Sequence, residues 1–457
     1  MIIILSRQAS QHCFAPKLFK SCAKLTMWNQ PMNLHTHDPR EHIRGIHQIL
    51  ISDKKRIGFL FGAGSSFATG VPSVCVPAIA DMTTQIEVAT ISTEFATAVK
   101  EIRGEIGDAL FNIESLLSSI EAKRAVIGEG TLNGLTSSGF SKFATFVKTR
   151  VVELVSVHEA LKPEDRIKLA HSKLSSWVSK ARRRFPAEIF TTNYDYLFEI
   201  ALEGSGIPYF DGFSGSYEPF FCPEAVEDVE AYPHLIKLWK MHGSLGWTYR
   251  ESDKAVIRKQ SAEAESILIY PSHLKYNTSK KQPYVGLIDR LCTFLQQDDA
   301  VLITCGYSFG DSHINERIAT SLRRGANSHV IAMYYDQCQD KDKKTVYGLT
   351  DAANNVRDMA THGTGGKMSV YGLRHAVIGG KFGEWRLRDE PKMSESIRVS
   401  QYFDEDASIL SEEAGEHKGD EKWMGAGRFL LPDFCKLTEF LNDLSSTETA
   451  TGPAKSA

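Results

Sequence analysis

The sequence predicts an α/β fold: a parallel sheet of about six strands, an inserted all-helical module and an irregular or helical C-terminal tail. Two observations lead to this prediction. Short, mostly apolar runs such as residues 57–61 and 300–305 have the composition of strands that are buried on both faces of a parallel sheet. Each run is followed at once by glycine, hydroxyl, amide or carboxylate groups. Because ligands bind outside the carboxyl ends of strands in open α/β sheets, we expect these polar segments to form one crevice.

At 457 residues the chain is long enough for two or three domains. Its 42% hydrophobic and 24% charged residues are typical of a globular protein, and its formal net charge is −3. This balance predicts neither a nucleic-acid-binding nor a membrane-binding surface, and no apolar run approaches the roughly 20 residues that cross a bilayer. The cysteines form no Cys-x-x-Cys pair, so the spacing of a zinc ribbon is missing. We interpret them as reduced thiols and expect a cytoplasmic protein that holds no metal.

The first segment, residues 1–37, contains no acidic residue and begins with an apolar run too short for a secretory leader. We expect it to be a flexible arm, or to lie ahead of the true start. Asp38 and Pro39 then have the order of a helix N-cap followed by proline in the first turn. The sheet-containing core is predicted to begin here and to comprise residues 38–80 and 181–390.

The first central strand is predicted at Ile57 to Phe61, and Gly62-Ala63-Gly64-Ser65-Ser66 follows it. Glycines permit a tight turn and let backbone N–H groups approach a pyrophosphate. The dinucleotide fingerprint Gly-x-Gly-x-x-Gly is incomplete, because position 67 is Phe. That departure weakens a dehydrogenase interpretation.

Residues 81–180 separate this strand from the next one and are far too long for a loop, since most connections have about 4–6 residues. Their apolar residues recur at helical spacing, for example at Ile113, Leu116, Leu117 and Ile120. We interpret the segment as an inserted helical module whose apolar stripes form its own core.

The next strand ends at Ile189-Phe190, and Thr191-Thr192-Asn193-Tyr194-Asp195 follows. The sequence leaves two interpretations open for Asn193 and Asp195. They either contact a ligand at the strand end or cap the helix that begins near Tyr194. The segment Lys240-Met241-His242-Gly243-Ser244 follows another apolar run in the same way.

Further strands are predicted at residues 266–271, 300–305 and 329–335. Gly306-Tyr307-Ser308-Phe309-Gly310-Asp311 follows the second of these, and Asp311 either caps the next helix or contacts a ligand. The glycines at 363–366 lack the spacing of a phosphate-binding loop, so we expect a flexible loop. Residues 391–457 are predicted to hold an acidic loop, one helix within 429–440 and a frayed end.

Taken in order, the strand-end motifs resemble those of the sirtuin superfamily, over roughly residues 50–340. The motifs are Gly-Ala-Gly-x-Ser from Gly62, Thr-x-Asn-x-Asp from Thr191, His242-Gly243-Ser244, and Gly306-x-Ser308. The Asp-Phe-Arg of deacylating sirtuins is replaced by Ser73-Val74-Cys75, and the zinc ribbon is absent. The extended Gly-Tyr-Ser-Phe-Gly-Asp segment is more similar to sirtuin-like NADases of bacterial anti-phage defence.

The resemblance implies a Rossmann-like core that binds NAD+ as substrate. It implies that Asn193 and His242 are catalytic, and that Asp195 holds the nicotinamide amide or fixes the Asn193 loop. A neutral amide such as that of Asn193 can orient ribose hydroxyls and water, and an imidazole can take a proton near neutral pH. The remaining residues implied in cofactor binding are Gly62, Ala63, Gly64, Ser65, Thr192, Gly306, Ser308 and Asp311.

The favoured function is therefore an NAD+ glycohydrolase that releases nicotinamide and ADP-ribose. The resemblance implies an NAD-depleting effector that is switched on by a signal or a partner, such as a hexameric ATPase-translocase, and that forms a homo-oligomer. Two alternatives remain open, an NAD-dependent protein deacylase and a non-catalytic NAD or ADP-ribose sensor. An assay with NAD+ alone distinguishes the three.

Overall fold

The computed structural model describes residues 35–447 apart from 182, 230–231, 251, 260–281, 326, 340–343, 349–350, 393–397, 407–408 and 411–420. The predicted arm before residue 35 and the predicted strand at 266–271 lie outside the described residues. None of the described helices combines the length and the apolar character needed to cross a membrane.

Over the described residues the main sheet has ten strands, more than the expected six or so. Seven consecutive strands pair in parallel, and they are β14 (Met368–Tyr371), β11 (His329–Met333), β10 (Ala300–Cys305), β2 (Arg56–Phe61), β3 (Glu188–Thr191), β7 (Ile236–Lys240) and β4 (Tyr209–Phe210). Beyond β14 the sheet continues through antiparallel β15 (His375–Ile378) to β16 (Lys381–Trp385) and β1 (His35–His37). The extra strands are short, and their sequences lack the continuous apolar runs that identified the central strands.

The register brings the carboxyl ends of the central strands to one edge. Cys305 at the end of β10 pairs with Phe61 of β2 on one side and with Met333 of β11 on the other. Phe61 in turn pairs with Thr191 of β3, and Thr191 with Lys240 of β7. The polar segments that follow these strands therefore leave the sheet side by side, as predicted.

Helices cover both faces of the sheet. On one face, α1 (Pro39–Ile51), α7 (Ala170–Lys180), α8 (Leu197–Gly204) and α14 (Phe434–Thr447) pack on a hydrophobic cluster that includes Ile57 and Phe59. On the other face, the cluster that includes Leu60 and Leu302 is covered by α9 (Pro223–Glu227), α11 (Tyr284–Gln296), α12 (Ser312–Arg324) and α13 (Asp351–Asp358). Alternate residues of β2 thus face opposite layers, as the strand's period of two requires.

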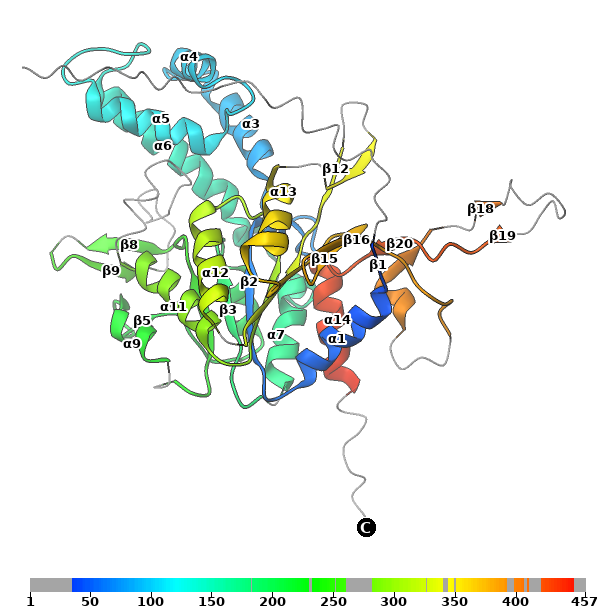
Figure 1. Cartoon of the computed structure of the whole chain (residues 1–457). Helices are drawn as coiled ribbons and strands as arrows, with labels where there is room; N and C mark the ends of the chain where they lie inside the picture. Colours follow the sequence, from blue (N-terminus) through cyan, green and yellow to red (C-terminus); the bar gives the residue numbers. More distant parts are fainter. Residues whose placement is uncertain are drawn as a thin grey trace, which may run out of the picture. The chain divides into compact units, whose positions relative to one another are not determined.

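Between β2 and β3 the chain forms α2 (Ala63–Phe67), α3 (Ile79–Thr90), α4 (Ala96–Ile106), α5 (Ile113–Val126), α6 (Ser137–Val155), two short 3₁₀ helices (Val157–Ala160 and Pro163–Lys168) and α7. Helices α3 to α6 share a hydrophobic cluster of their own, which Leu245 from the segment after β7 also joins. Figure 1 shows these four helices beyond the edge of the sheet where the central strands end. The residue limits of a separate module stay a prediction.

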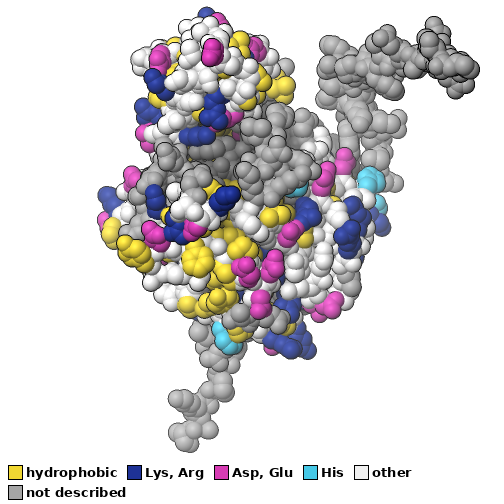
Figure 2. Space-filling model, turned by 90° about the vertical axis from the view of Figure 1, so that its left-hand side faces the viewer, with side chains coloured by type: hydrophobic (Ala, Val, Ile, Leu, Met, Phe, Trp, Pro, Cys, Tyr) yellow, Lys and Arg dark blue, Asp and Glu magenta, His cyan; other side chains and the backbone are white. Residues whose placement is uncertain are grey.

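The remaining strands form small antiparallel sheets. They are β5 (Phe213–Ser214), β6 (Phe220–Phe221), β9 (Ala255–Arg258) and β8 (Trp247–Arg250) in one sheet, then the pairs β12 (Gln337–Gln339) with β13 (Thr345–Tyr347), β17 (Phe403–Glu405) with β20 (Gly427–Phe429), and β18 (Ile409–Leu410) with β19 (Glu421–Lys422). Charged side chains of both signs are mixed over the face shown in Figure 2. This mixture agrees with the nearly balanced composition.

The last helix, α14, begins and ends later than the predicted 429–440. Pro432 and Asp433 precede it, and Asp433 accepts a hydrogen bond from the backbone N–H of Lys436. The glycine-rich segment near residue 365 holds Lys367, whose Nζ donates to the carbonyl oxygen of Leu322 at 3.0 Å. Lys367 therefore binds the carboxyl end of α12, a favourable place for a cation.

Candidate active site

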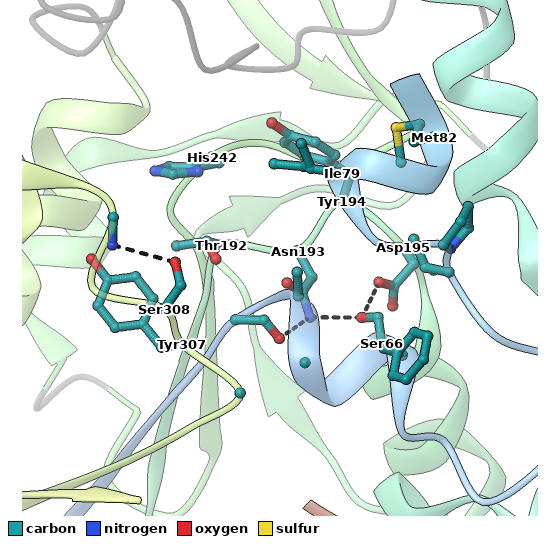
Figure 3. Close-up of a pocket in the computed structure, with 18 of the residues that line it drawn as sticks. Ser66, Ile79, Met82, Thr192, Asn193, Tyr194, Asp195, His242, Tyr307 and Ser308 are labelled. Atoms are coloured by element: carbon teal, nitrogen blue, oxygen red, sulfur yellow. Dashed lines mark hydrogen bonds between the residues drawn. The ribbon is translucent and has the colours of Figure 1, made fainter. Parts of the chain in front are cut away.

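A cavity of about 690 Å³ lies where the central strands end. Loops after β2, β3, β7, β10 and β11 line it, together with the start of α14 and residues of α3, α5 and α6. Figure 3 shows Asn193 and His242 facing the same space, with Tyr307 and Ser308 on one side and Met82 on the other. The predicted site residues that line the cavity are Gly62, Ala63, Gly64, Thr192, Asn193, Asp195, His242, Gly306, Ser308 and Asp311.

Ser65 is the predicted site residue that does not line the cavity. Its side chain is fully buried, and its hydroxyl donates to the carbonyl oxygen of Gly62 at 2.9 Å. The resemblance implied that Ser65 contacts the ligand, whereas the turn of α2 directs its side chain into the protein. Ser65 is therefore a residue that supports the glycine loop.

The glycine loop packs backbone to backbone against the loop after β10. The N–H of Gly64 donates to the carbonyl oxygen of Gly306 at 2.9 Å, and a Cβ added at Gly64 would lie 2.6 Å from Cα of Gly306. Gly306 has a φ of +65°, which favours glycine. We expected these glycines to leave room for a pyrophosphate. At position 64, however, glycine is required because the two loops approach each other closely.

The same contacts occupy several donors that were expected to bind phosphate. The N–H groups of Gly62 and Ser65 bond to the carbonyl oxygens of Cys305 and Gly62. Over the described residues, no protein acceptor is seen for the N–H of Ala63, which is the first residue of α2. Ala63 therefore offers the donor of this loop that is open to a ligand.

Asn193 is held by a directed chain of hydrogen bonds. Its Nδ2 lies 2.6 Å from Oγ of Ser66 and 3.0 Å from both Oγ of Ser65 and the carbonyl oxygen of Gly62. Ser66 in turn donates to Oδ2 of Asp195 at 2.5 Å. Figure 3 shows this chain along the cavity, from Asn193 through Ser66 to Asp195. The amide nitrogen is thereby engaged by the protein, so the oxygen of Asn193 is the atom left to accept from a ligand.

Asp195 binds the start of α8, as the capping interpretation expected. Its Oδ1 accepts from the N–H of Leu197 at 3.0 Å, at the start of α8, and its Oδ2 accepts from Ser66. Asp195 thus fixes the loop that carries Asn193. Asn193 itself makes no capping bond to α8.

A buried lysine joins the loops after β3 and β7. The Nζ of Lys240, the last residue of β7, donates to the carbonyl oxygens of Tyr194, at 3.2 Å, and of Asp195, and to Oε1 of Glu199 at 2.7 Å. Burial is the main cause that raises the pKa of Glu199, and the nearby charge of Lys240 opposes that rise. The side chain of Lys240 is 4% exposed, so these bonds form with little competition from water. Lys240 therefore ties the backbone beside Asn193 to the strand that leads to His242.

His242 is paired with Asp311 from the loop after β10. The Nε2 of His242 lies 3.3 Å from Oδ2 of Asp311, and both side chains are about one-tenth exposed. Asp311 also caps α12 through its Oδ1, which accepts from the N–H groups of His313 at 3.0 Å and Ile314 at 3.2 Å. The capping interpretation of Asp311 is thus confirmed. Its contact with a ligand stays a prediction. A carboxylate in this position orients the imidazole and stabilises the charge that it gains with a proton.

Buried polar contacts hold the loop that carries Asp311. Asn315 on α12 donates to the carbonyl oxygen of Phe309 at 2.7 Å and accepts from the hydroxyl of Tyr307 at 3.1 Å. Phe309 has a φ of +56°, an uncommon conformation for a residue with a side chain. Burial raises the pKa of Tyr307 well above its ordinary value, and the charge of Asp311 adds to this, so the hydroxyl remains a donor.

Two parts of the cavity were not predicted from the sequence. An apolar branch is formed by α3, α5 and α6, and its residues are Ile79, Met82, Ile113, Leu117, Val151 and Val155. The opposite end is lined by Tyr334, Tyr335, Asp433 and Phe434. Helical spacing identified some of the first group as apolar, and nothing in the sequence linked residue 433 to a strand that ends at residue 333.

Cys305 is not a candidate nucleophile. It is fully buried at the end of β10, and burial raises the pKa of its thiol. Its Sγ lies 3.5 Å from the carbonyl oxygen of Pro432. The thiol therefore stays protonated at neutral pH and serves as packing between β10 and α14.

The geometry defines an α/β protein with a cavity at the carboxyl edge of a mainly parallel sheet. Residues 187–357 match the family model of the SIR2-like domain, and this region contains Asn193, His242 and the segment 306–311. This part of the chain is thus similar to a SIR2-like domain. The glycine loop lies before the matched residues, and no curated protein matches the sequence.

Solved structures of Sir2 proteins are similar to this chain at low scores. A Sir2 homologue in complex with NAD is 15% identical, with a TM-score of 0.32, over 66% of this chain and 86% of the other. A mutant Sir2 homologue in complex with ADP-ribose is 12% identical, with a TM-score of 0.31, over 68% of this chain and 92% of the other. Because these TM-scores are low, only the sequence match of residues 187–357 relates this chain to the SIR2-like domain.

Proposed function

We propose that this protein is an NAD+ glycohydrolase that cleaves the bond between nicotinamide and ribose. The observation that carries the proposal is the meeting of Asn193 and His242 in one cavity with the loops after β2 and β10. The two residues come from neighbouring strands, β3 and β7, and Lys240 fastens their loops together. The similarity to a SIR2-like domain supports NAD as the ligand.

We infer the direction of the bound dinucleotide from the strand order and from the proposed roles of Asn193 and His242. The loops after β2 and β10 are central, so the pyrophosphate would lie over Ala63 and near Ser308. The nicotinamide riboside would then extend toward Asn193 and His242, and the adenosine toward Tyr334 and Tyr335 beyond β11.

In the proposed reaction the C1′–N1 bond breaks and water supplies the oxygen that replaces it. NAD+ and water give ADP-ribose, nicotinamide and one proton. The leaving group is cationic and departs neutral, so no general acid is needed at the nicotinamide nitrogen. The amide oxygen of Asn193 accepts from a ribose hydroxyl or the water, and His242, oriented by Asp311, takes the proton.

The test is to measure nicotinamide release from NAD+ alone by chromatography, for the wild type, Asn193→Ala, His242→Ala and the double variant. We expect each single change to lower the rate at least about 100-fold, the range for loss of a base or of orientation. The double variant should lose little more, since both groups act on one transition state. A suitable control is His47→Ala, because His47 lies on α1 and does not line the cavity.

A correctly folded double variant that turns NAD+ over at the wild-type rate would overturn the proposal. The assay is to be run in the activated state of the protein, because we further propose an anti-phage effector whose NAD depletion is switched on by a signal or a partner protein. A homo-oligomer and a hexameric ATPase-translocase are the assemblies that we propose to seek. Their presence can be tested by the mass of the native complex.

The apolar branch favours a second candidate, an NAD-dependent deacylase. The apolar branch has the lining that an acyl chain would need, and it belongs to the same cavity as Asn193. A deacylase would release nicotinamide only when an acyl-lysine peptide is added. The same assay with and without such a peptide separates the two activities, and NAD binding without turnover in both would indicate a sensor.

A further inference from the structure

The charges that line the cavity are unevenly distributed. Of the described residues that line it, none is lysine or arginine, whereas its carboxylates are Glu114, Asp195, Asp311 and Asp433. Asp195 and Asp311 belong to the Asn193 and His242 networks, and Glu114 lies in the first turn of α5. Asp433 is therefore the carboxylate at the end where β10 and β11 finish.

Asp433 is firmly placed. Its Oδ1 accepts from the N–H of Lys436 at 3.0 Å, and its carbonyl oxygen accepts from the N–H of Leu437 at 2.9 Å, as in an N-cap of α14. The preceding residue, Pro432, contacts Cys305 at the end of β10. Asp433 and Tyr335 both line the cavity. Burial raises the pKa of Tyr335, and the charge of Asp433 adds to this.

The neighbouring cations are directed elsewhere. Lys436 and Lys173 both pair with Glu439, at 3.0 Å and 3.1 Å. Arg428 is bonded to Asp404 on the adjacent strand, and its Nε lies 3.2 Å from that carboxylate. None of the three lines the cavity.

We propose that Asp433 reads the 2′ position of the adenosine ribose and restricts the site to dinucleotides without a 2′-phosphate. This inference rests on the proposed function, because the strand order that directs nicotinamide toward Asn193 directs adenosine toward Asp433. A carboxylate at this point of a dinucleotide site accepts a hydrogen bond from the ribose 2′-hydroxyl, whereas a 2′-phosphate needs a cation. Here a 2′-phosphate would meet a like charge and no lysine or arginine of the described lining.

The test measures binding by calorimetry with two ligands that need no turnover, ADP-ribose and ADP-ribose 2′-phosphate. The variants are Asp433→Asn, which keeps a capping side chain and removes the charge, and Asp38→Asn, which makes the same change at the N-cap of α1 away from the cavity. We expect the wild type to bind ADP-ribose at least about tenfold more tightly than its 2′-phosphate, a modest effect for like charges. Asp433→Asn should reduce that ratio at least about fivefold, mainly through tighter binding of the 2′-phosphate. Asp38→Asn should leave it unchanged.

Equal affinities of the wild type for the two ligands, or an unchanged ratio in folded Asp433→Asn, would overturn the inference and leave the proposed function standing. Failure of both ligands to bind to the wild type would overturn the proposed function together with the inference. Thermal melting followed by circular dichroism establishes that each variant is folded before its affinities are compared.

Discussion

The imidazole of His242 and the carboxylate of Asp311 both line the cavity, and Nε2 of His242 lies 3.3 Å from Oδ2 of Asp311. The two residues follow different strands, β7 and β10, and β2 and β3 lie between those strands in the sheet. The loop from Gly306 to Asp311 therefore extends past the central strands to reach His242. Because Asp311 uses its other oxygen to cap α12, the helix and the imidazole are positioned by one side chain.

This pairing predicts the effect of Asp311→Asn. Asparagine keeps the cap on α12 but removes the charge that orients His242. We expect kcat for NAD+ to fall at least about tenfold with a smaller change in KM, and the pH dependence of kcat to change, because the imidazolium loses its counter-charge. Steady-state kinetics across pH 5 to 9 measure both effects. A variant with wild-type kcat and pH profile would show that Asp311 does not act through His242.

Lys240→Met tests whether the clamp on the Asn193 loop supports catalysis. The change leaves Glu199 buried without its cation, so we expect a loss of about 3–5 kcal/mol in stability, as for other broken buried pairs. Changing Glu199→Gln as well should recover part of that stability but not kcat, because the carbonyl oxygens of Tyr194 and Asp195 still lack their donor.

Chemical denaturation and steady-state kinetics separate these two effects. Lys237→Met is the matched control, since Lys237 is also a buried lysine of β7 but donates to the carbonyl oxygen of Tyr232. If the double variant regains kcat along with stability, the role of Lys240 is structural only.

Gly64→Ala is predicted to destabilise the fold and not only to weaken NAD binding. The new Cβ would lie 2.6 Å from Cα of Gly306, a backbone contact that no rotamer can relieve. We expect a loss of about 1–3 kcal/mol, as for other overpacked sites.

Gly45→Ala in α1 supplies the opposite control. No atom lies within 4 Å of a Cβ there, and alanine in a helix interior is favoured over glycine by about 0.5–1 kcal/mol. Urea denaturation of both variants gives the comparison. An unchanged midpoint for Gly64→Ala would mean that the two loops separate at no cost.

The burial of His171 predicts that the protein loses stability in acid. It is fully buried against Phe198 and Phe434, both ring nitrogens lack a hydrogen-bond partner among the described residues, and burial lowers its pKa to about 4. The unfolded chain, with a pKa near 6.5, takes up the proton first as the pH falls. The contribution of neutral His171 to the free energy of unfolding is therefore complete above pH 6.5. It is lost as the pH falls from about 6.5 to 4, and the loss is at most about 3 kcal/mol.

Replacement by phenylalanine removes the titrating group from an aromatic cluster. We expect His171→Phe to flatten the fall of the free energy of unfolding between pH 7 and pH 5, measured by denaturation at each pH. His42, whose pKa burial also lowers to about 4, remains and keeps part of the slope. A slope equal to that of the wild type would show that His171 does not titrate on unfolding in this range.

Much of the fold could be predicted because buried parallel strands have a strong local signature. The strands at 56–61, 188–191, 236–240, 300–305 and 329–333 coincide with apolar runs, and the capping role of Asp38 follows from its own neighbours. The strands β1, β4, β14, β15 and β16 were missed. Their pairing depends on the strands beside them and not on a pattern of their own.

For the candidate site, the sequence by itself determined which polar groups follow the central strands. A parallel sheet must bring those groups to one edge, so Asn193, His242 and Ser308 line one cavity. Tertiary structure alone decided how these groups are placed. The side chain of Ser65 points into the protein, Gly64 packs against Gly306, and Asp433, at the start of α14, lies near the end of β10. The last two contacts join residues that lie far apart in the chain. Their geometry is set by the packing of whole elements, which no local pattern of residues encodes.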